Sequence, residues 1–244
     1  MQISEIPVVA TLPLWSEQWN KEALQRRRKA IGETAYARGF QQKALSDKDA
    51  PFAGLIERCL VSADWKSIVR DEWPRYGGVD LAGEKRPGTV IFTLAKDPET
   101  GKKYPIEIVY GKWQAGRTVT ELEAAYQRHK HQRINVETNG LQKILVDWIA
   151  KTDGKSRFAV KAFVTGAQKS HPEYGVPGMA VEMENGAWAI CTGDKEHEYD
   201  CRCGLCLWLK ELKAWPVGAT TDVVMASWFA SEAARKSTAS VRWL

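Results

Sequence analysis

Three acidic residues, far apart in the chain, each lie at the end of a segment with strand or helix character. Asp80 and Glu137 end short apolar runs, and Asp222 opens a segment with helical periodicity. Carboxylates that meet in one cleft repel one another, so their pKa values rise or they recruit divalent cations. Recruited cations would create a site for metal-assisted hydrolysis of a phosphodiester. The chemistry therefore depends on whether these three side chains converge.

Several strands and helices must position these acids. Apolar alternation and helical spacing predict strands at 76–81, 89–94, 106–113, 133–136 and 157–164, and helices at 20–36, 141–149, 205–215 and 221–235. A Thr-x-x-Glu capping box at Thr118 predicts a further helix through residue 131. The turn dipeptide Asn185-Gly186 predicts a hairpin within 180–191. This order indicates the α/β class, a mixed sheet with helices against it.

The connection between the third and fourth strands decides where the acids lie. A helical crossover there would make the first and fourth strands neighbours, so Asp80 and Glu137 would project from the same edge of the sheet. The helix that begins at Thr221 would close over them. Its N-terminal dipole would favour an anion, such as a scissile phosphate, nearby.

The composition allows one large domain and an anionic partner. The chain has 244 residues, 44% of them hydrophobic, with a net charge of +5 and a pI near 8.9. We expect an N-terminal arm or linker at 1–70, a main domain at 71–236 and a tail at 237–244. The arm carries a basic helix around Arg26-Arg27-Arg28-Lys29, which is either a solvated face or a stripe that follows phosphates. No apolar run approaches the roughly 20 residues of a membrane span, and no secretory signal opens the chain.

The segments around the acids resemble a known family. The sequences GVDLA at 78–82, NVETN at 135–139 and TDVVMA at 221–226 resemble the three acidic motifs of the nuclease domain of tailed-bacteriophage terminase large subunits. The TGAQK segment at 165–169 resembles the Thr-x-x-x-Lys element of the same family, and the resemblance runs from about residue 14 to 235. It implies a ribonuclease H-like fold and an endonuclease that cuts concatemeric viral DNA during genome packaging.

The resemblance also implies roles for individual residues. Asp80, Glu137 and Asp222 would bind two Mg²⁺ or Mn²⁺ ions, which would activate a water molecule and stabilise the departing 3′ oxygen. Lys169 would lie near the DNA backbone, the alternative being a solvated lysine. The implied partners are double-stranded DNA, an ATPase motor, a portal and a small terminase subunit, in the host cytoplasm.

Two features depart from the family pattern. Many members carry a pair of acids at the third motif, whereas Thr221 precedes Asp222 here. Glu84 is the nearest extra carboxylate, although a solvated loop with Lys85 suits it better. No Gly-x-x-x-x-Gly-Lys-Ser/Thr phosphate loop is present, so we expect no ATP hydrolysis by this chain and a motor that is separate or was excised.

A cluster of potential zinc ligands lies in a Cys-rich insertion at about 191–206. It contains His197, Cys201, Cys203 and Cys206 within ten residues, and Cys191 is a spare ligand. A Zn²⁺ bound to four protein ligands would be structural. The alternative is a set of reduced thiols packed under the following helix. The odd total of five cysteines favours a reduced, intracellular protein, with Cys59 as a lone core thiol.

The remaining histidines give weaker signals. His129 and His131 lie at the end of a polar helix and are expected to be solvated, and His171 is expected in a loop. Two other functions stay open beside the terminase-type nuclease. One is a Holliday-junction resolvase on the same fold, and the other is a zinc-stabilised DNA-binding module without catalysis, which the single acid of the third motif keeps open.

Overall fold

The centre of the protein is a five-stranded mixed sheet. The computed structural model describes residues 19–40, 51–52, 54–81, 88–137, 160–171, 173–193, 201–216 and 218–236. The strands are β2 (Arg75–Asp80), β3 (Thr89–Lys96), β4 (Lys103–Gly111), β5 (Arg133–Glu137) and β6 (Val160–Phe163), in the spatial order β4-β3-β2-β5-β6. Strands β2, β3 and β4 are antiparallel, whereas β2, β5 and β6 are parallel. The predicted pairing of the first and fourth strands of the sheet is confirmed.

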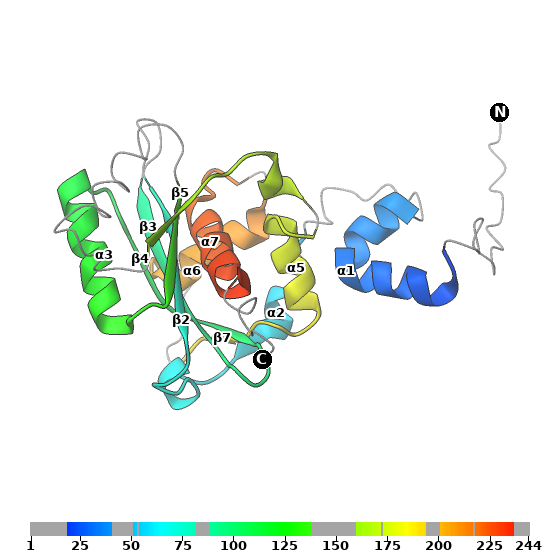
Figure 1. Cartoon of the computed structure of the whole chain (residues 1–244), viewed down its shortest axis with the longest axis horizontal. Helices are drawn as coiled ribbons and strands as arrows, with labels where there is room; N and C mark the ends of the chain where they lie inside the picture. Colours follow the sequence, from blue (N-terminus) through cyan, green and yellow to red (C-terminus); the bar gives the residue numbers. More distant parts are fainter. Residues whose placement is uncertain are drawn as a thin grey trace, which may run out of the picture.

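Helices cover both faces of the sheet (Figure 1). Helix α3 (Ala115–His129) makes the crossover from β4 to β5 and buries Leu122 and Ala125 against Val79, Ile91 and Ile134. Helix α7 (Asp222–Lys236) lies on the other face, where it packs closely against β2. Helices α5 (Val176–Glu184) and α6 (Gly204–Ala214) pack against α7 in turn. The apolar alternation of the strands divides the core into these two layers.

Shorter elements surround the sheet. Helix α2 (Ile56–Cys59) leads into β1 (Leu60–Val61), which pairs in parallel with β7 (Ile190–Cys191). The 3₁₀ turns are η1 (Trp65–Ser67) and η2 (Ala167–Ser170). Helix α1 (Lys21–Phe40) bends at Gly32 and packs on α5, and its Arg27 forms an ion pair with Glu173, three residues before α5. None of the described helices combines the length and apolar character that a membrane crossing requires.

The capping box at Thr118 is a wrong prediction. Helix α3 begins at Ala115, three residues earlier, after Gln114 in extended conformation. Thr118 lies inside the helix, and its hydroxyl donates to the Gln114 carbonyl at 3.3 Å. Glu121 forms an (i, i+4) ion pair with Arg117 at 2.6 Å, so its carboxylate stabilises the surface of the helix and does not cap the helix start.

The hairpin around Asn185-Gly186 is also wrong. Residues 176–184 form α5 because Val176, Met179 and Met183 recur at helical spacing and are buried. Asn185-Gly186 ends this helix, with Gly186 at a φ of 73°. The chain then forms β7 instead of a returning strand of the main sheet.

His129, the last residue of α3, and His131 are buried, contrary to the expectation that they are solvated. His129 Nε2 lies 3.0 Å from a Glu107 oxygen. Lys130 adopts a left-handed conformation, with a φ of 48°, and turns the chain back onto the sheet, where His131 Nε2 lies 3.0 Å from the Thr93 hydroxyl. Cys59 is a buried thiol, as predicted. The predicted helix at 141–149 lies outside the described residues, and the division into arm, domain and tail stays a prediction.

Candidate active site

Asp80 and Glu137 lie side by side at the carboxyl ends of two parallel strands. Val79 of β2 pairs with Val136 of β5, and the two acids directly follow this pair. Neighbouring strands are about 4.8 Å apart, so the backbones that carry the acids are close. Relative exposures are 1% for Asp80 and 2% for Glu137. Two adjacent carboxylates at this depth require compensation by hydrogen bonds or by cations.

Both acids lie on the sheet face that α7 covers. A Cβ atom added to Gly78 would come within 2.0 Å of the Ala226 carbonyl oxygen and 2.3 Å of the Ala230 nitrogen, so this face of β2 touches the helix backbone. Asn135 of β5 donates from its side chain to the Phe229 carbonyl at 3.0 Å. Asp80 and Glu137 each follow one of these residues by two positions, and alternate residues of a strand share a face.

The direction of α7 brings Asp222 to the same end of the sheet. Lys96, which lies beside the start of β2, donates to the Ala234 carbonyl at 3.3 Å, so the C-terminal part of α7 covers the start of β2. The helix therefore runs antiparallel to β2. From the contact between Gly78 and Ala226, Asp222 lies about 6 Å back along the helix and Asp80 about 6.6 Å forward along the strand. Asp222 and Asp80 therefore lie at a similar distance from this contact, toward the same end of the sheet.

The Thr-x-x-x-Lys element lies beside these acids. Phe163 of β6 pairs with Glu137, and two residues later the Thr165 hydroxyl donates to Glu137 Oε1 at 2.7 Å. Thr165 therefore fixes one oxygen of the carboxylate. Lys169 follows in η2, and its side chain is exposed.

Glu211 of α6 caps the start of α7. Its carboxylate accepts from the backbone N–H groups of Val223 at 2.8 Å and Val224 at 3.1 Å and from the Thr220 hydroxyl at 2.7 Å. Burial raises the pKa of Glu211, its hydrogen bonds oppose the rise, and Asp222 adds to it. The anion expected at this N-terminus is therefore a side chain of the protein, and these two N–H groups are already engaged. Glu84, the other proposed carboxylate, lies outside the described residues.

The donor set suits hard divalent cations. Carboxylate oxygens are the ligands that Mg²⁺ and Mn²⁺ prefer. Across the part of the chain that the structure describes, only one set of three His, Cys, Asp or Glu side chains has all its ligand atoms within 4.8 Å, and it is made of cysteines. The ligand atoms of Asp80, Glu137 and Asp222 do not all lie within this distance of one another.

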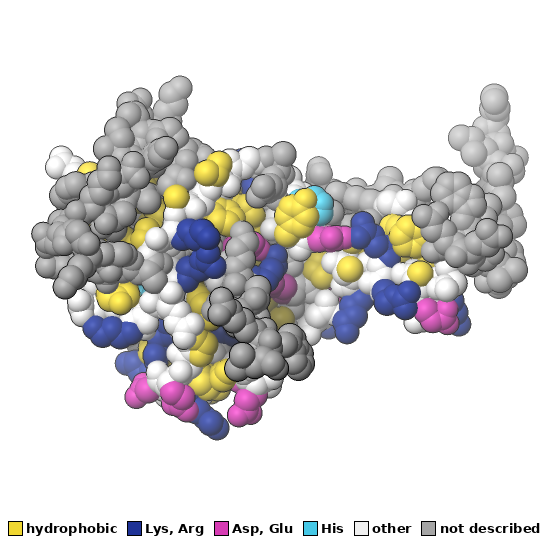
Figure 2. Space-filling model, in the orientation of Figure 1, with side chains coloured by type: hydrophobic (Ala, Val, Ile, Leu, Met, Phe, Trp, Pro, Cys, Tyr) yellow, Lys and Arg dark blue, Asp and Glu magenta, His cyan; other side chains and the backbone are white. Residues whose placement is uncertain are grey.

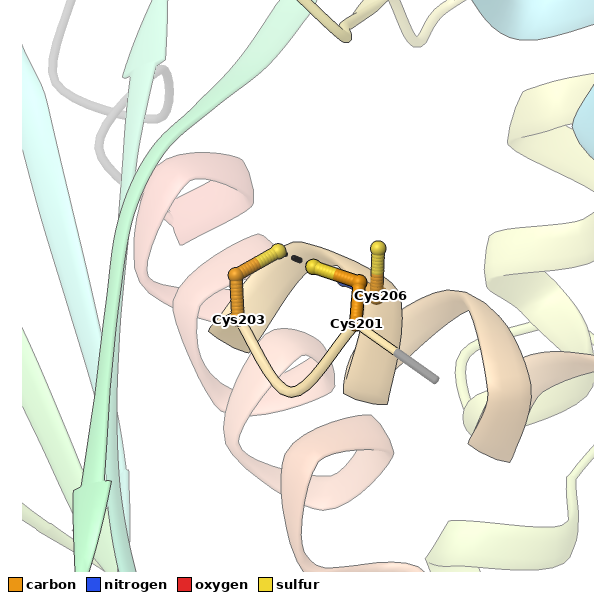
Figure 3. Close-up of side chains that lie close together, drawn as sticks. All are labelled: Cys201, Cys203 and Cys206. Carbon is orange, nitrogen blue, oxygen red and sulfur yellow. Dashed lines mark hydrogen bonds between the residues drawn. The ribbon is translucent and has the colours of Figure 1, made fainter. Parts of the chain in front are cut away.

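That set consists of Cys201, Cys203 and Cys206 at the start of α6 (Figure 3). Cys203 is the N-cap of the helix, and its sulfur accepts from the Cys206 N–H at 3.4 Å. Burial raises the pKa of Cys206 to about 12, and the neighbouring Cys203 and Cys201 thiols add to the rise. His197 lies outside the described residues. Cys191 is buried in β7.

Solved structures with a similar fold are nuclease domains of terminases. The nuclease domain of the human cytomegalovirus terminase superposes with a TM-score of 0.51 at 12% identity, covering 78% of this chain and 94% of that one. The same domain soaked with Mn and bound to an inhibitor gives a TM-score of 0.51 at 11% identity, with the same coverages. The chain has the fold of a terminase nuclease domain. The large terminase nuclease of the thermophilic phage G20c is also similar, with a TM-score of 0.47, 15% identity, and coverage of 75% and 97%, but the fold assignment does not depend on it.

The terminase nuclease fold confirms the predicted fold class, a ribonuclease H-like mixed sheet flanked by helices. No protein-family model and no curated protein matches the chain. The roles of individual residues stay predictions. Sequence reasoning missed Glu211, although an acid beside the apolar residues Trp208 and Leu212 of one helix stripe was a usable signal.

Proposed function

We propose that this protein is a divalent-metal-dependent DNA endonuclease of the terminase type. One observation carries the proposal: Asp80 and Glu137 are buried at paired strand ends, on the face covered by a helix that begins at Asp222. Divalent cations would compensate the charge of buried acids at one end of a sheet, and the fold is that of terminase nuclease domains. The Mn soaked into the cytomegalovirus domain makes Mn²⁺ a natural first choice beside Mg²⁺.

The reaction would be hydrolysis of a phosphodiester. A new P–O bond forms to a water oxygen, the bond to the 3′ oxygen breaks, and a proton moves to the departing oxygen. Asp80, Glu137 and Asp222 would hold Mg²⁺ or Mn²⁺ ions, which supply Lewis acidity and a more acidic bound water. Thr165 would keep Glu137 oriented through its 2.7 Å hydrogen bond. Lys169 is an exposed cation four residues further on, and we assign it to a DNA phosphate.

DNA contact would be electrostatic and independent of sequence. The chain has a net charge of +5, and Arg26, Arg28 and Lys29 are exposed on α1. Figure 2, in the orientation of Figure 1, shows Lys and Arg side chains on the sheet region and on α1. Binding of this kind weakens as salt rises, because it releases counterions from the DNA.

The test is cleavage of supercoiled plasmid in Mg²⁺ or Mn²⁺. Asp80→Asn keeps the size of the side chain and removes its charge, and it should lower the cleavage rate at least about 100-fold. Glu72→Gln is the matched control, since Glu72 is an exposed acid outside the site, and it should cleave like the wild type. Full cleavage by folded Asp80→Asn protein would refute the role of this acid.

Two other functions are distinguished by measuring binding and cleavage of a four-way junction and of linear duplex side by side. A resolvase would prefer a four-way junction to linear duplex by a wide margin. A DNA-binding module would bind duplex and cleave nothing in any divalent ion.

As a terminase-type enzyme, we propose, the protein cuts concatemeric viral DNA in the host cytoplasm together with an ATPase motor, a portal and a small terminase subunit.

A further inference from the structure

Three thiols at the start of α6 are arranged as a ligand set. The sulfur atoms of Cys201, Cys203 and Cys206 all lie within 4.8 Å of one another, and none of the three residues is fully buried (Figure 3). In a tetrahedral zinc site with Zn–S bonds of about 2.3 Å, the sulfur atoms are about 3.8 Å apart. The observed set therefore requires little movement to close around one ion.

The backbone that carries these thiols is anchored without any metal. A Cβ atom added to Gly204 would lie 2.4 Å from the Ile108 carbonyl oxygen, so the turn lies directly against β4. The Tyr110 hydroxyl donates to the Arg202 carbonyl at 2.5 Å from the same strand. The Cys206 N–H already points at the Cys203 sulfur, and an N–H group at a helix start stabilises a thiolate.

The chemistry of the donors selects the ion. Sulfur ligands prefer Zn²⁺ over Mg²⁺ and Mn²⁺, which prefer oxygen, so this cluster and the carboxylates would take different metals. Binding would break three S–H bonds, form three Zn–S bonds and release three protons to the solvent, with no oxidation or reduction. A water molecule or a further side chain would complete the tetrahedron.

We propose that Cys201, Cys203 and Cys206 bind one Zn²⁺ ion, which closes the turn that leads into α6. The position of α6 matters for the acids, because Glu211 on this helix caps α7 at Val223 and Val224. Zinc would thus stabilise the helix pair on which Asp222 lies. The importance of this stabilisation for Asp222 rests on the proposed function, whereas zinc binding does not.

Metal content of the purified chain tests the binding step. The wild type, prepared without chelator and with a reductant, should contain about one zinc per chain. Cys203→Ser and Cys206→Ser should each lose most of it, whereas Cys59→Ala, which removes a buried thiol outside the cluster, should retain it. Replacement of zinc by Co²⁺ should give thiolate-to-cobalt charge-transfer absorption that both serine variants lose. A zinc-free wild type that gives no such absorption with added Co²⁺ would overturn the proposal.

A measurement on the wild type covers the case in which the serine variants do not fold. Removal of zinc with a chelator should lower the Tm by at least about 4 °C, and added Zn²⁺ should restore it. An unchanged Tm after complete removal would contradict the stabilising role of the ion. Asp80→Asn protein should keep its zinc while losing cleavage, so failure of the zinc site and failure of the nuclease proposal give separate results.

Discussion

The hydroxyl of Thr165 holds one oxygen of Glu137 in place. Glu137 ends β5, Thr165 follows the neighbouring parallel strand β6 by two residues, and their hydrogen bond of 2.7 Å is half-buried. A carboxylate that already accepts one strong hydrogen bond has fewer orientations open to it, so its other lone pairs are directed more uniformly. In the proposed site, Thr165 is therefore a positioning residue and Glu137 the ligand.

Replacing Thr165 tests this assignment. Thr165→Val has nearly the same shape without the hydroxyl, and we expect weaker metal binding by about 10–100-fold, seen as a higher Mn²⁺ concentration for half-maximal cleavage. Thr165→Ser restores the hydroxyl and should restore the Mn²⁺ dependence. A uniformly lower rate with an unchanged Mn²⁺ dependence in both variants would indicate a merely structural role.

The residues of the candidate site differ in how far the sequence reveals their positions. The places of Asp80 and Glu137 at strand ends could be predicted, because a short apolar run ending in an acid defines a strand end locally. The function of Glu211 as a cap could not, because its partners Val223 and Val224 belong to another helix. Only an acid among the apolar positions of α6 pointed to it.

At the scale of elements, the contact between β2 and α7 sets the height of Asp222 against the sheet. Gly78 lies directly beneath the helix backbone, next to Ala226 and Ala230. Any side chain there would push α7 away from the strand. The small residues on α7 and the glycine on β2 thus allow the close packing that brings the acidic ends together.

Gly78→Ala should separate the two elements. Its Cβ would meet backbone atoms at 2.0 Å and 2.3 Å, which cannot rotate away as a side chain could, so we expect at least about 1–3 kcal/mol of lost stability in urea unfolding, and impaired cleavage. Gly116→Ala is the control, because Gly116 is exposed in α3 with nothing within 4 Å of an added Cβ. That change should be neutral or stabilise by up to about 1 kcal/mol. Equal stability of the two variants would contradict the close-contact argument.

Local signals predicted most elements but not their ends. The strands of the sheet and α7 follow from apolar alternation and helical spacing, which each segment carries by itself. The Asn185-Gly186 dipeptide suits both a hairpin and a helix end, and the apolar residues of 176–183, at helical spacing, decide for the helix. A turn signal therefore has to be weighed with the period of the residues before it.

At the scale of the whole molecule, burial of charged and titratable groups depends on packing that no single segment encodes. Lys103 is buried with Glu182, which also accepts from Arg235 and Trp188, so four segments share one ion cluster. His131 is likewise buried by a residue from another segment, since it follows α3 and contacts Thr93 of β3. Its polar sequence context suggested solvent, because the packing of α3 on the sheet was not visible locally.

The burial of His131 makes the stability of the fold depend on pH. Burial, together with a smaller effect of the neighbouring His129 and against the opposing effect of Glu107, lowers the pKa of His131 from 6.5 to about 3. The folded protein therefore excludes a proton that the unfolded chain binds. The stabilisation is complete above about pH 6.5 and is lost progressively as the pH falls toward about 3.

Urea unfolding between pH 7.5 and pH 5 measures this effect. We expect the free energy of unfolding of the wild type to fall below pH 6.5 with a contribution from His131 of up to about 1.4 kcal/mol per pH unit. His131→Gln cannot take up the proton and can still bond to Thr93, so its slope should be smaller by that amount. The pKa of Glu107 is lowered from 4.5 to about 2, so the unfolded chain begins to take up a proton there only near pH 5, which adds a small slope of the same sign to both proteins. Identical slopes for the two proteins would show that His131 is accessible to protons in the folded state, which its burial against the sheet argues against.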